Sequence, residues 1–294
     1  MTLFSNSLDF KLFGQNFSIQ YYALCLITGA IVTYLLCRHF AEKFHKKGTL
    51  IDNMFIPCFV SGILGARLWF VVSEWDFYMS YPSEILKIWH GGLAIQGGLI
   101  VGAAVGIIMV YLDHKKNPDG LSKKENIFRW MDIILPNILI AQAIGRWGNF
   151  FNVEVYGECV STSKLWFIPD FIMKRLQMDT YGIPLCPAGK AVQPLFLYEG
   201  LLNFLGFILI SFVLRYLWKN RKLGILGFMY VGFYGIVRIL LEPLREEEFI
   251  MRIGNMSQSV FMSAIFIIIG VAGIIWIYWP EIKKVFQKGN KQNG

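Results

Sequence analysis

The segment from Gly145 to Gly157 carries the side chains best suited to bind an anionic ligand. It follows an apolar run and combines Arg146 with the amides of Asn149 and Asn152 and the carboxylate of Glu154. A guanidinium meets a phosphate with two parallel hydrogen bonds, and a cation at membrane depth is a functional-site hypothesis by default. The pattern therefore predicts a phosphate site. For Arg146 alone, an arginine that reaches from a helix end to the lipid headgroups is the simpler explanation.

A second group of polar side chains closes the apolar run 225–241. Tyr234, Arg238 and Glu242 are four residues apart, and Arg245 follows seven residues after Arg238, so all four share one side of a helix. The proline that follows Glu242 is expected to disrupt this helix near its end. When this run is considered alone, a structural ion pair between Arg238 and Glu242 explains it as well as a functional role does.

The composition of the chain is that of an integral membrane protein. Of the 294 residues, 55% are hydrophobic and 16% are charged, and the mean hydropathy is +0.49. The basic residues behind the formal charge of +8 lie in short segments between apolar runs, which indicates membrane topology rather than nucleic-acid binding. Cys25, Cys37 and Cys58 lack the spacing of metal ligands, so no metal and no other cofactor is expected.

Seven apolar segments qualify as candidate membrane spans by their length. They cover residues 19–37, 54–72, 91–112, 130–145, 194–214, 225–241 and 260–279. We therefore expect an all-α integral membrane protein of about seven transmembrane helices, folded as a single catalytic domain over residues 1–294. Arg67, Arg146 and Arg238 lie within the spans or directly at their ends and are left out of the count. The segments 38–53, 113–129, 215–224 and 280–294 carry 17 Lys and Arg residues, and the segments on the other side carry 8. Because basic connections stay in the cytoplasm, this predicts an outer N-terminus and a cytoplasmic C-terminus.

With this orientation, the polar residues of the apolar runs fall at the outer side of the membrane. They are Tyr22, Arg67, Gln96, Arg146, Tyr198, Glu199 and Arg238. Unrelated side chains would scatter to both sides, so the shared depth favours one common site. His90 lies in a glycine-rich loop before Gln96 and is explained equally well as a headgroup contact and as an interfacial residue without a role.

The connection 151–193 is expected to fold as a small cap on the outer face, between the fourth and fifth spans. It contains Pro169, Pro184 and Pro187, and long connections inside compact domains are usually functional or disordered. Cys159 and Cys186 are the two cysteines of this connection, where an oxidising environment would permit a disulfide.

Taken together, these residues resemble the prolipoprotein diacylglyceryl transferase family of bacteria. The family pattern G-R-x-G-N-F-x-N-x-E-x-x-G is matched at residues 145–157. Further family elements are matched by Gly65-Ala66-Arg67-Leu68, by Leu197-Tyr198-Glu199, and by Tyr234 with Arg238, Glu242 and Arg245. Tyr22 falls where the family has a tyrosine in its first span. The resemblance covers most of the chain and implies a seven-span enzyme of the bacterial cell membrane, open to the outer leaflet.

The resemblance also implies a reaction and a set of site residues. The family moves a diacylglyceryl group from phosphatidylglycerol, a membrane lipid, to the lipobox cysteine thiol of a preprolipoprotein, which leaves a thioether and releases glycerol 1-phosphate. The catalytic candidates are Arg146, Arg238, Glu154, Tyr234 and Gln96. The substrate-binding candidates are Arg146, Asn149, Asn152, Gly157, Tyr22, Arg67, Tyr198, Glu199, Glu242, Arg245 and His90. In this scheme the arginines stabilise the phosphate charge, and Glu154 and Glu242 hold the arginines in place.

The acceptor of the thiol proton stays open, as do two other functions. Gln96 stands where the family usually has a histidine, and a glutamine cannot take a proton. Either the cationic site enlarges the ionised fraction of a thiol whose free pKa is about 8.5, or His90 removes the proton. The alternative functions are a catalytically divergent family member that binds phosphatidylglycerol and a seven-span transporter or receptor for an anion.

Overall fold

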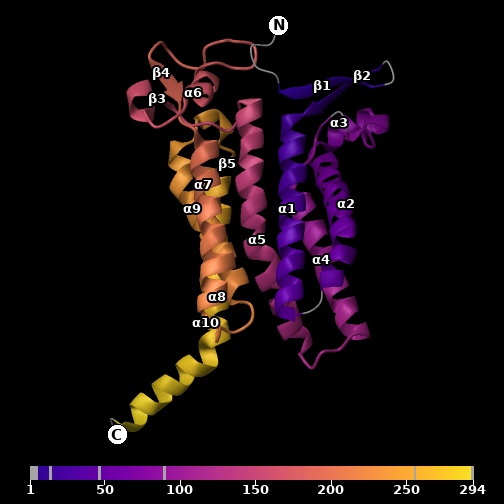
Figure 1. The fold of residues 1–294 in the computed structure, drawn as a ribbon, viewed down its shortest axis with the longest axis vertical. Helices are drawn as coiled ribbons and strands as arrows, with labels where there is room; N and C mark the ends of the chain where they lie inside the picture. The colour runs from indigo at the N-terminus through magenta and orange to yellow at the C-terminus, as the bar shows by residue number, and fades with distance from the viewer. Residues whose placement is uncertain (1–5, 13–14, 46–47, 89–90, 255, 293–294) are drawn as a thin grey trace. The chain divides into compact units, whose positions relative to one another are not determined.

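The fold consists of long helices joined by short structured connections (Figure 1). The computed structural model describes residues 6–12, 15–45, 48–88, 91–254 and 256–292. Within these residues, seven helices are long and apolar enough to cross a membrane. They are α1 (Tyr21–His45), α2 (Gly48–Ser73), α4 (Ile95–Lys116), α5 (Lys123–Asn152), α7 (Leu195–Phe207) with its helical continuation to Leu217, α9 (Ile225–Leu241) with the turn that extends it to Leu244, and α10 (Gln258–Gln292). The expected all-α fold with seven spans is therefore confirmed.

Helix α5 is longer than the sequence pattern predicted. The expected span ended at residue 145, whereas the helix continues to Asn152. The glycines in this stretch do not end it, because they make room for α1: a Cβ atom at Gly148 would lie 2.6 Å from the ring of Tyr22. As a result, Arg146 and Asn149 project from a regular helix rather than from a loop.

Short elements connect the spans. β1 (Ser7–Leu12) pairs antiparallel with β2 (Gln15–Gln20), with Ser7 opposite Gln20. The sequence of β1 alternates apolar and polar residues, which is the period of a strand, but a search for long apolar windows does not register it. Helix α7 continues through a π-helical segment (Ile208–Leu214) into α8 (Arg215–Leu217). The remaining short elements are α3 (Trp75–Ser80), 3-10 turns at Pro82–Glu84 and Glu247–Phe249, and the paired strands β5 (Arg252–Ile253) and β6 (Met256–Ser257) before α10.

The connection between α5 and α7 is folded, as expected for the cap. β3 (Cys159–Ser161) pairs antiparallel with β4 (Lys190–Val192), and the 3-10 turn Thr162–Leu165 and α6 (Asp170–Gln177) follow β3. Leu165, Ile172, Leu176 and Val192 belong to the small hydrophobic core of this segment. The predicted disulfide between Cys159 and Cys186 is present, with the Cα atoms 5.9 Å apart. The location of this cap on the outer face of the membrane stays a prediction.

The chain divides into two compact units, residues 1–33 with 131–294 and residues 34–130. The single catalytic domain over residues 1–294 therefore stays a prediction. In the unit 34–130, α2 and α4 pack closely, because a Cβ atom at Gly65 would lie only 2.6 Å from the carbonyl oxygen of Gly97.

In the larger unit, Asp132 of α5 ties neighbouring helices together. Its carboxylate accepts hydrogen bonds from the backbone N–H groups of Gly224 and Gly227 at 2.8 and 2.9 Å, at the start of α9. Its backbone carbonyl accepts a hydrogen bond from Nη2 of Arg215 in α8 at 2.6 Å. These contacts satisfy free N–H groups at the helix start and fix α5, α8 and α9 at one end. Helices α5 and α9, and α7, which precedes α8 in one continuous helical segment, carry the polar cluster described below toward their other end.

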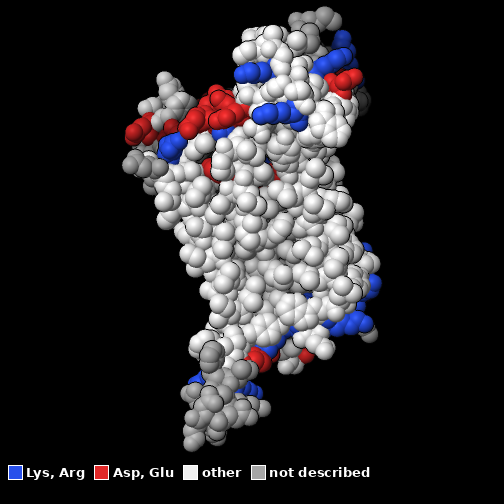
Figure 2. Space-filling view, turned by 90° about the vertical axis from the view of Figure 1, so that its left-hand side faces the viewer, with Lys and Arg blue, Asp and Glu red and all other residues white. Residues whose placement is uncertain are grey.

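A broad band of the protein surface carries almost no charged side chains, as expected for apolar membrane-spanning helices (Figure 2). On the face shown in Figure 2, Lys, Arg, Asp and Glu side chains gather at two ends, and the band between them carries almost none. Helix α10 contains an 18-residue window with a mean hydropathy of 2.7. A band of this kind is what contact with lipid chains requires.

Candidate active site

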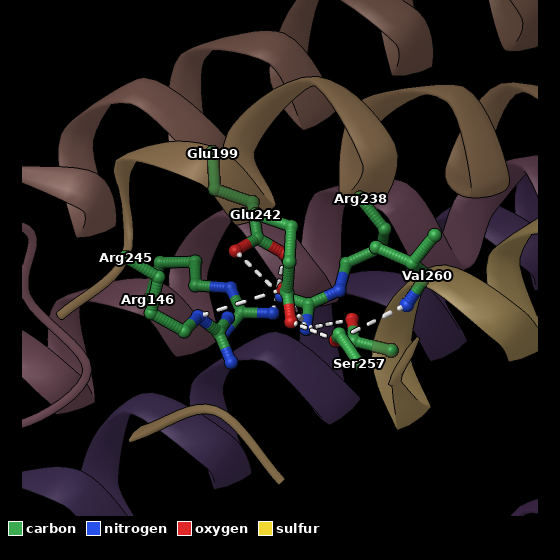
Figure 3. Close-up of polar contacts among 8 residues, drawn as sticks. Arg146, Glu199, Arg238, Glu242, Arg245, Ser257 and Val260 are labelled. Atoms are coloured by element: carbon green, nitrogen blue, oxygen red, sulfur yellow. Dashed lines mark hydrogen bonds and ion pairs between the residues drawn. The ribbon is translucent and has the colours of Figure 1, made fainter. Parts of the chain in front are cut away.

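Five buried or half-buried charged side chains converge from α5, α7, α9 and the turn that follows α9 (Figure 3). Glu199 of α7 forms an ion pair with Arg146 of α5, and its other carboxylate oxygen lies 3.4 Å from Nη1 of Arg238 in α9. Glu242 follows α9 directly, and its Oε2 lies 3.6 Å from Nη2 of Arg238 and 3.8 Å from Nε of Arg245. We call these five residues the arginine cluster.

The arginine cluster carries one positive charge more than its carboxylates balance, since it combines three arginines with two glutamates. Glu199 and Glu242 are only 3% and 4% exposed. Burial, and after it the positive charge of Arg238, lower the pKa of Arg245. A buried excess of guanidinium groups favours an anionic ligand with several oxygen atoms.

Local sequence explains how these side chains meet. Gly200 follows Glu199 and lies against α5, where a Cβ atom at Gly200 would be in ordinary contact, 3.5 Å from the carbonyl oxygen of Ala143. At the end of α9, Pro243 lies in the 3-10 turn Glu242–Leu244, after which Arg245 has an extended backbone. The predicted disruption of the helix is confirmed, and the turn brings Arg245 beside Glu242.

Two serines that the sequence analysis did not single out complete the arginine cluster. The hydroxyl of Ser259 accepts a hydrogen bond of 2.6 Å from Nη2 of Arg238. The hydroxyl of Ser257 donates to Oε1 of Glu242 and accepts a hydrogen bond of 3.4 Å from the backbone N–H of Val260 (Figure 3). Ser257 therefore caps α10 while it holds Glu242. A serine directly before a long apolar run is the usual signal of a helix cap and could have identified it.

The segment that follows α5 is strained around Glu154. Val153 and Val155 have φ values of 53° and 55°, a backbone region that β-branched residues rarely adopt. Gly157 closes the segment: its N–H donates a hydrogen bond of 3.1 Å to the carbonyl oxygen of Gln193, and it pairs with Arg245 as an isolated bridge. No side chain fits at Gly157, because a Cβ atom there would collide with the backbone of Leu244.

The expectation that Glu154 holds an arginine is wrong. Among the described residues, no ion pair involves Glu154; its Oε1 accepts a hydrogen bond of 3.5 Å from Nδ2 of Asn152. Burial raises the pKa of Glu154. Glu199 takes the expected role instead, because it lies between two helices and reaches Arg146 and Arg238 at once. That contact depends on how α5, α7 and α9 pack, which residue spacing along one chain segment does not reveal.

The other candidates of the larger unit lie near the arginine cluster or next to it in sequence. Tyr22 of α1 is within electrostatic range of both Glu154 and Arg146. Asn149 is 8% exposed and lines a small cavity together with Glu154. Tyr234 lies one helical turn from Arg238, with its ring 6.4 Å from that of Tyr230. Tyr198 directly precedes Glu199 in α7 and is partly buried.

Three candidates belong to the unit 34–130, which is described by itself. Arg67 is 6% exposed, and its guanidinium donates hydrogen bonds to the backbone carbonyl groups of Glu84, Ile85, Lys87, Gly91 and Gly92. These bonds organise the connection between α3 and α4, which is a structural function for Arg67. Gln96 is exposed in the first turn of α4. His90 lies outside the described residues.

Comparison with known proteins gives the family. The model of the family described as "Prolipoprotein diacylglyceryl transferase" matches residues 10–276. A relative from Streptococcus mutans serotype c is 38% identical over 259 residues, which cover 88% of this chain and 90% of the relative. A relative from Streptococcus agalactiae serotype Ia is 35% identical, and the aligned region covers 88% of this chain and 92% of the relative. A relative from Streptococcus uberis is 38% identical, and the aligned region covers 88% of this chain and 91% of the relative.

All three relatives carry the name phosphatidylglycerol–prolipoprotein diacylglyceryl transferase. The match extends from β1 into α10 and includes both the arginine cluster and the strained segment around Glu154. This chain belongs to the prolipoprotein diacylglyceryl transferase family.

Proposed function

We propose that this chain transfers the diacylglyceryl group of phosphatidylglycerol to the lipobox cysteine thiol of preprolipoproteins, forming a thioether and releasing glycerol 1-phosphate. The observation that carries the proposal is the arginine cluster, in which three guanidinium groups face two buried carboxylates. The names of the relatives supply the substrate class, a phosphatidylglycerol donor and a prolipoprotein acceptor.

The reaction needs charge stabilisation at the leaving phosphate. When the sulfur atom attacks the glycerol carbon, the bond from that carbon to the phosphate oxygen breaks, and the phosphate gains negative charge. Arg146 and Arg238 supply charge-assisted hydrogen bonds to that charge, and they act more strongly where water is scarce. Glu199 keeps both guanidinium groups oriented before the substrate binds, which lowers the cost of reorganisation during the reaction.

The amides beside Arg146 are suited to the glycerol headgroup. Asn149 and Asn152 lie in the last turn of α5, and Arg146 lies earlier on the same helix. Hydroxyl groups of a glycerol accept and donate hydrogen bonds, and an amide side chain offers both. We assign Asn149, Asn152, Tyr22 and Tyr198 to the headgroup and Arg245 with Glu242 to the support of Arg238. In this scheme Gly157 lets the backbone after Glu154 return to Arg245.

The substrates fix the location that we propose for the protein. Both are embedded in the bacterial cell membrane and are presented on its outer side, and the Lys and Arg distribution predicts an outer N-terminus and a cytoplasmic C-terminus. The ends of α5 and α9 that bear the arginine cluster then face the outer leaflet.

A test with labelled phosphatidylglycerol and a lipobox peptide separates this function from its alternatives. A thioether product supports the transferase. Saturable binding of phosphatidylglycerol without product would favour a divergent lipid-binding member of the family.

A further inference from the structure

Glu154 differs from the other two carboxylates of the site in its partners. Glu199 and Glu242 are nearly buried and lie within ion-pair distance of arginines. Glu154 has no ion-pair partner in the part of the chain that the structure describes, and Asn152 donates a hydrogen bond to one of its oxygens only. A carboxylate held by an arginine is a poor proton acceptor, because the ion pair favours its ionised form. Glu154 is free of that restraint.

The backbone holds Glu154 in a fixed position at an energetic cost. Val153 and Val155, on either side of it, both have positive φ values, which are unfavourable for β-branched residues. The N–H of Glu154 donates a hydrogen bond of 3.1 Å to the carbonyl oxygen of Asn149, so the segment turns back onto the end of α5. Strain of this kind persists where the surrounding structure enforces it, and it is concentrated at functional sites.

The surroundings of Glu154 connect it to both the arginine cluster and a pocket. Tyr22 of α1 lies within electrostatic range of Glu154 and of Arg146. Glu154 also lines a cavity of about 20 Å³, enough for one water molecule, together with Asn149, Tyr156, Arg175 of α6 and Gln193. Of the charged or titratable groups around Glu154, Tyr22 interacts with it electrostatically, and Tyr156 and Arg175 line the same cavity.

We propose that the carboxylate of Glu154 accepts the proton of the lipobox thiol. The inference rests on the proposed transferase function and assigns a step that the roles of the arginines leave open. The thiolate sulfur forms the new bond to the glycerol carbon, and the bond between that carbon and the phosphate oxygen breaks, with its electron pair going to the phosphate. The thiol proton moves to Glu154, which then releases it to the glycerol 1-phosphate or to water.

Two further observations support this assignment. Gln96 cannot accept a proton, so a different side chain must do so if an amino-acid side chain performs this step. Burial raises the pKa of Glu154 and brings it closer to the pKa of a thiol, which makes proton transfer between them less unfavourable. Glu154 must be ionised to act, so the rate should rise with pH through this raised pKa and then level off.

The experiment compares Glu154→Gln with the wild-type protein on two lipobox peptides, one with cysteine and one with selenocysteine. A selenol is ionised at neutral pH and needs no proton acceptor. With the cysteine peptide we expect Glu154→Gln to lose roughly 100-fold to 10,000-fold in rate, as when a general base is lost. With the selenocysteine peptide we expect a loss of less than about 10-fold. Glu247→Gln, which changes an exposed carboxylate paired with Arg252, serves as the matched control.

Equal losses on the two peptides would show that Glu154 has a structural role and would overturn the inference. If the Glu154→Gln protein is not produced in folded form, Glu154→Asp is compared on the same two peptides. Its shorter side chain displaces the carboxylate without removing it. A wild-type protein that forms no thioether with the cysteine peptide would instead overturn the transferase function on which the inference rests.

Discussion

The carboxylate of Glu199 accepts a hydrogen bond from the guanidinium of Arg146, and this contact joins two helices that are separated by the whole cap in sequence. The other oxygen of Glu199 lies 3.4 Å from Arg238 on a third helix. One buried carboxylate therefore fixes the two arginines that we assign to the phosphate.

Replacement of either arginine should remove most activity. Arg146→Ala and Arg238→Ala each delete a charge-assisted contact to the leaving phosphate, and we expect losses of roughly 100-fold or more in kcat. The measurement is the rate of thioether formation at saturating phosphatidylglycerol, with membrane insertion checked by fractionation. Arg252→Ala, in which the lost arginine is half-exposed and paired with Glu247, should keep its activity. Near wild-type turnover of Arg146→Ala or Arg238→Ala would refute their phosphate role.

Glu199→Gln should separate positioning from binding. The glutamine preserves the size of the side chain but removes the charge that orients both guanidinium groups. We expect kcat to fall by about 10-fold to 100-fold, because small displacements of a positioning group have effects of that size, while phosphatidylglycerol still binds to the now more positive cluster. Removing one partner of a buried ion pair should also lower the melting temperature, by an amount that corresponds to about 3–5 kcal/mol.

One outcome would contradict the orienting role that we predict for Glu199. If the dissociation constant for phosphatidylglycerol rises sharply while kcat stays constant, Glu199 contributes to binding rather than to orientation. Glu248→Gln, which alters a glutamate that accepts a hydrogen bond from Tyr156 outside the arginine cluster, is the control for the loss of one carboxylate.

The disulfide should stabilise the cap. Alkylation should modify three cysteines without reductant, namely Cys25, Cys37 and Cys58, and five after reduction. The double replacement Cys159→Ala with Cys186→Ala should destabilise the cap by about 2–4 kcal/mol, because the disulfide closes a loop of 27 residues. Limited proteolysis should then cut within residues 159–192 sooner than in Cys58→Ala. The same number of alkylated cysteines with and without reductant would show that the disulfide is absent.

The orientation can be read from single cysteines in a protein whose free native cysteines have been replaced. Cysteines at Lys43, Lys116 and Lys219 should resist a membrane-impermeant maleimide in intact cells, since the basic connections are predicted to be cytoplasmic. Cysteines at Lys87 and Lys174 should react. Labelling of any of the first three from outside would reverse the topology and remove the arginine cluster from the outer leaflet.

Hydropathy was sufficient to predict the seven helices, because a bilayer requires long apolar segments and the described part of the chain contains seven of them. The pattern placed the end of α5 too early, since the apolar run ends at Gly145, whereas the helix continues to Asn152 with Gly148 packed against α1. The hairpin β1–β2 was missed, because its short alternating pattern is invisible to a search for long apolar runs.

The sequence predicted the members of the arginine cluster better than their contacts. The spacing correctly brought Arg238, Glu242 and Arg245 together, although Glu242 lies in a 3-10 turn after α9 and Arg245 in an extended segment rather than on the same helix. The link from Glu199 to two arginines could not be predicted, because it depends on the packing of three helices, and the same limitation led to the wrong role for Glu154. Arg67 was grouped with the site by its depth, whereas its hydrogen bonds show that it organises the connection before α4.

The most direct test follows both products of the reaction in one assay. Purified protein in phosphatidylglycerol bilayers, with the lipid labelled in its headgroup glycerol, is incubated with a lipobox peptide. The account predicts that the peptide gains the mass of a diacylglyceryl group on its cysteine and that labelled glycerol 1-phosphate appears in equal amount. Binding of the lipid with neither product, under conditions in which Arg252→Ala and wild type bind equally, would contradict the account.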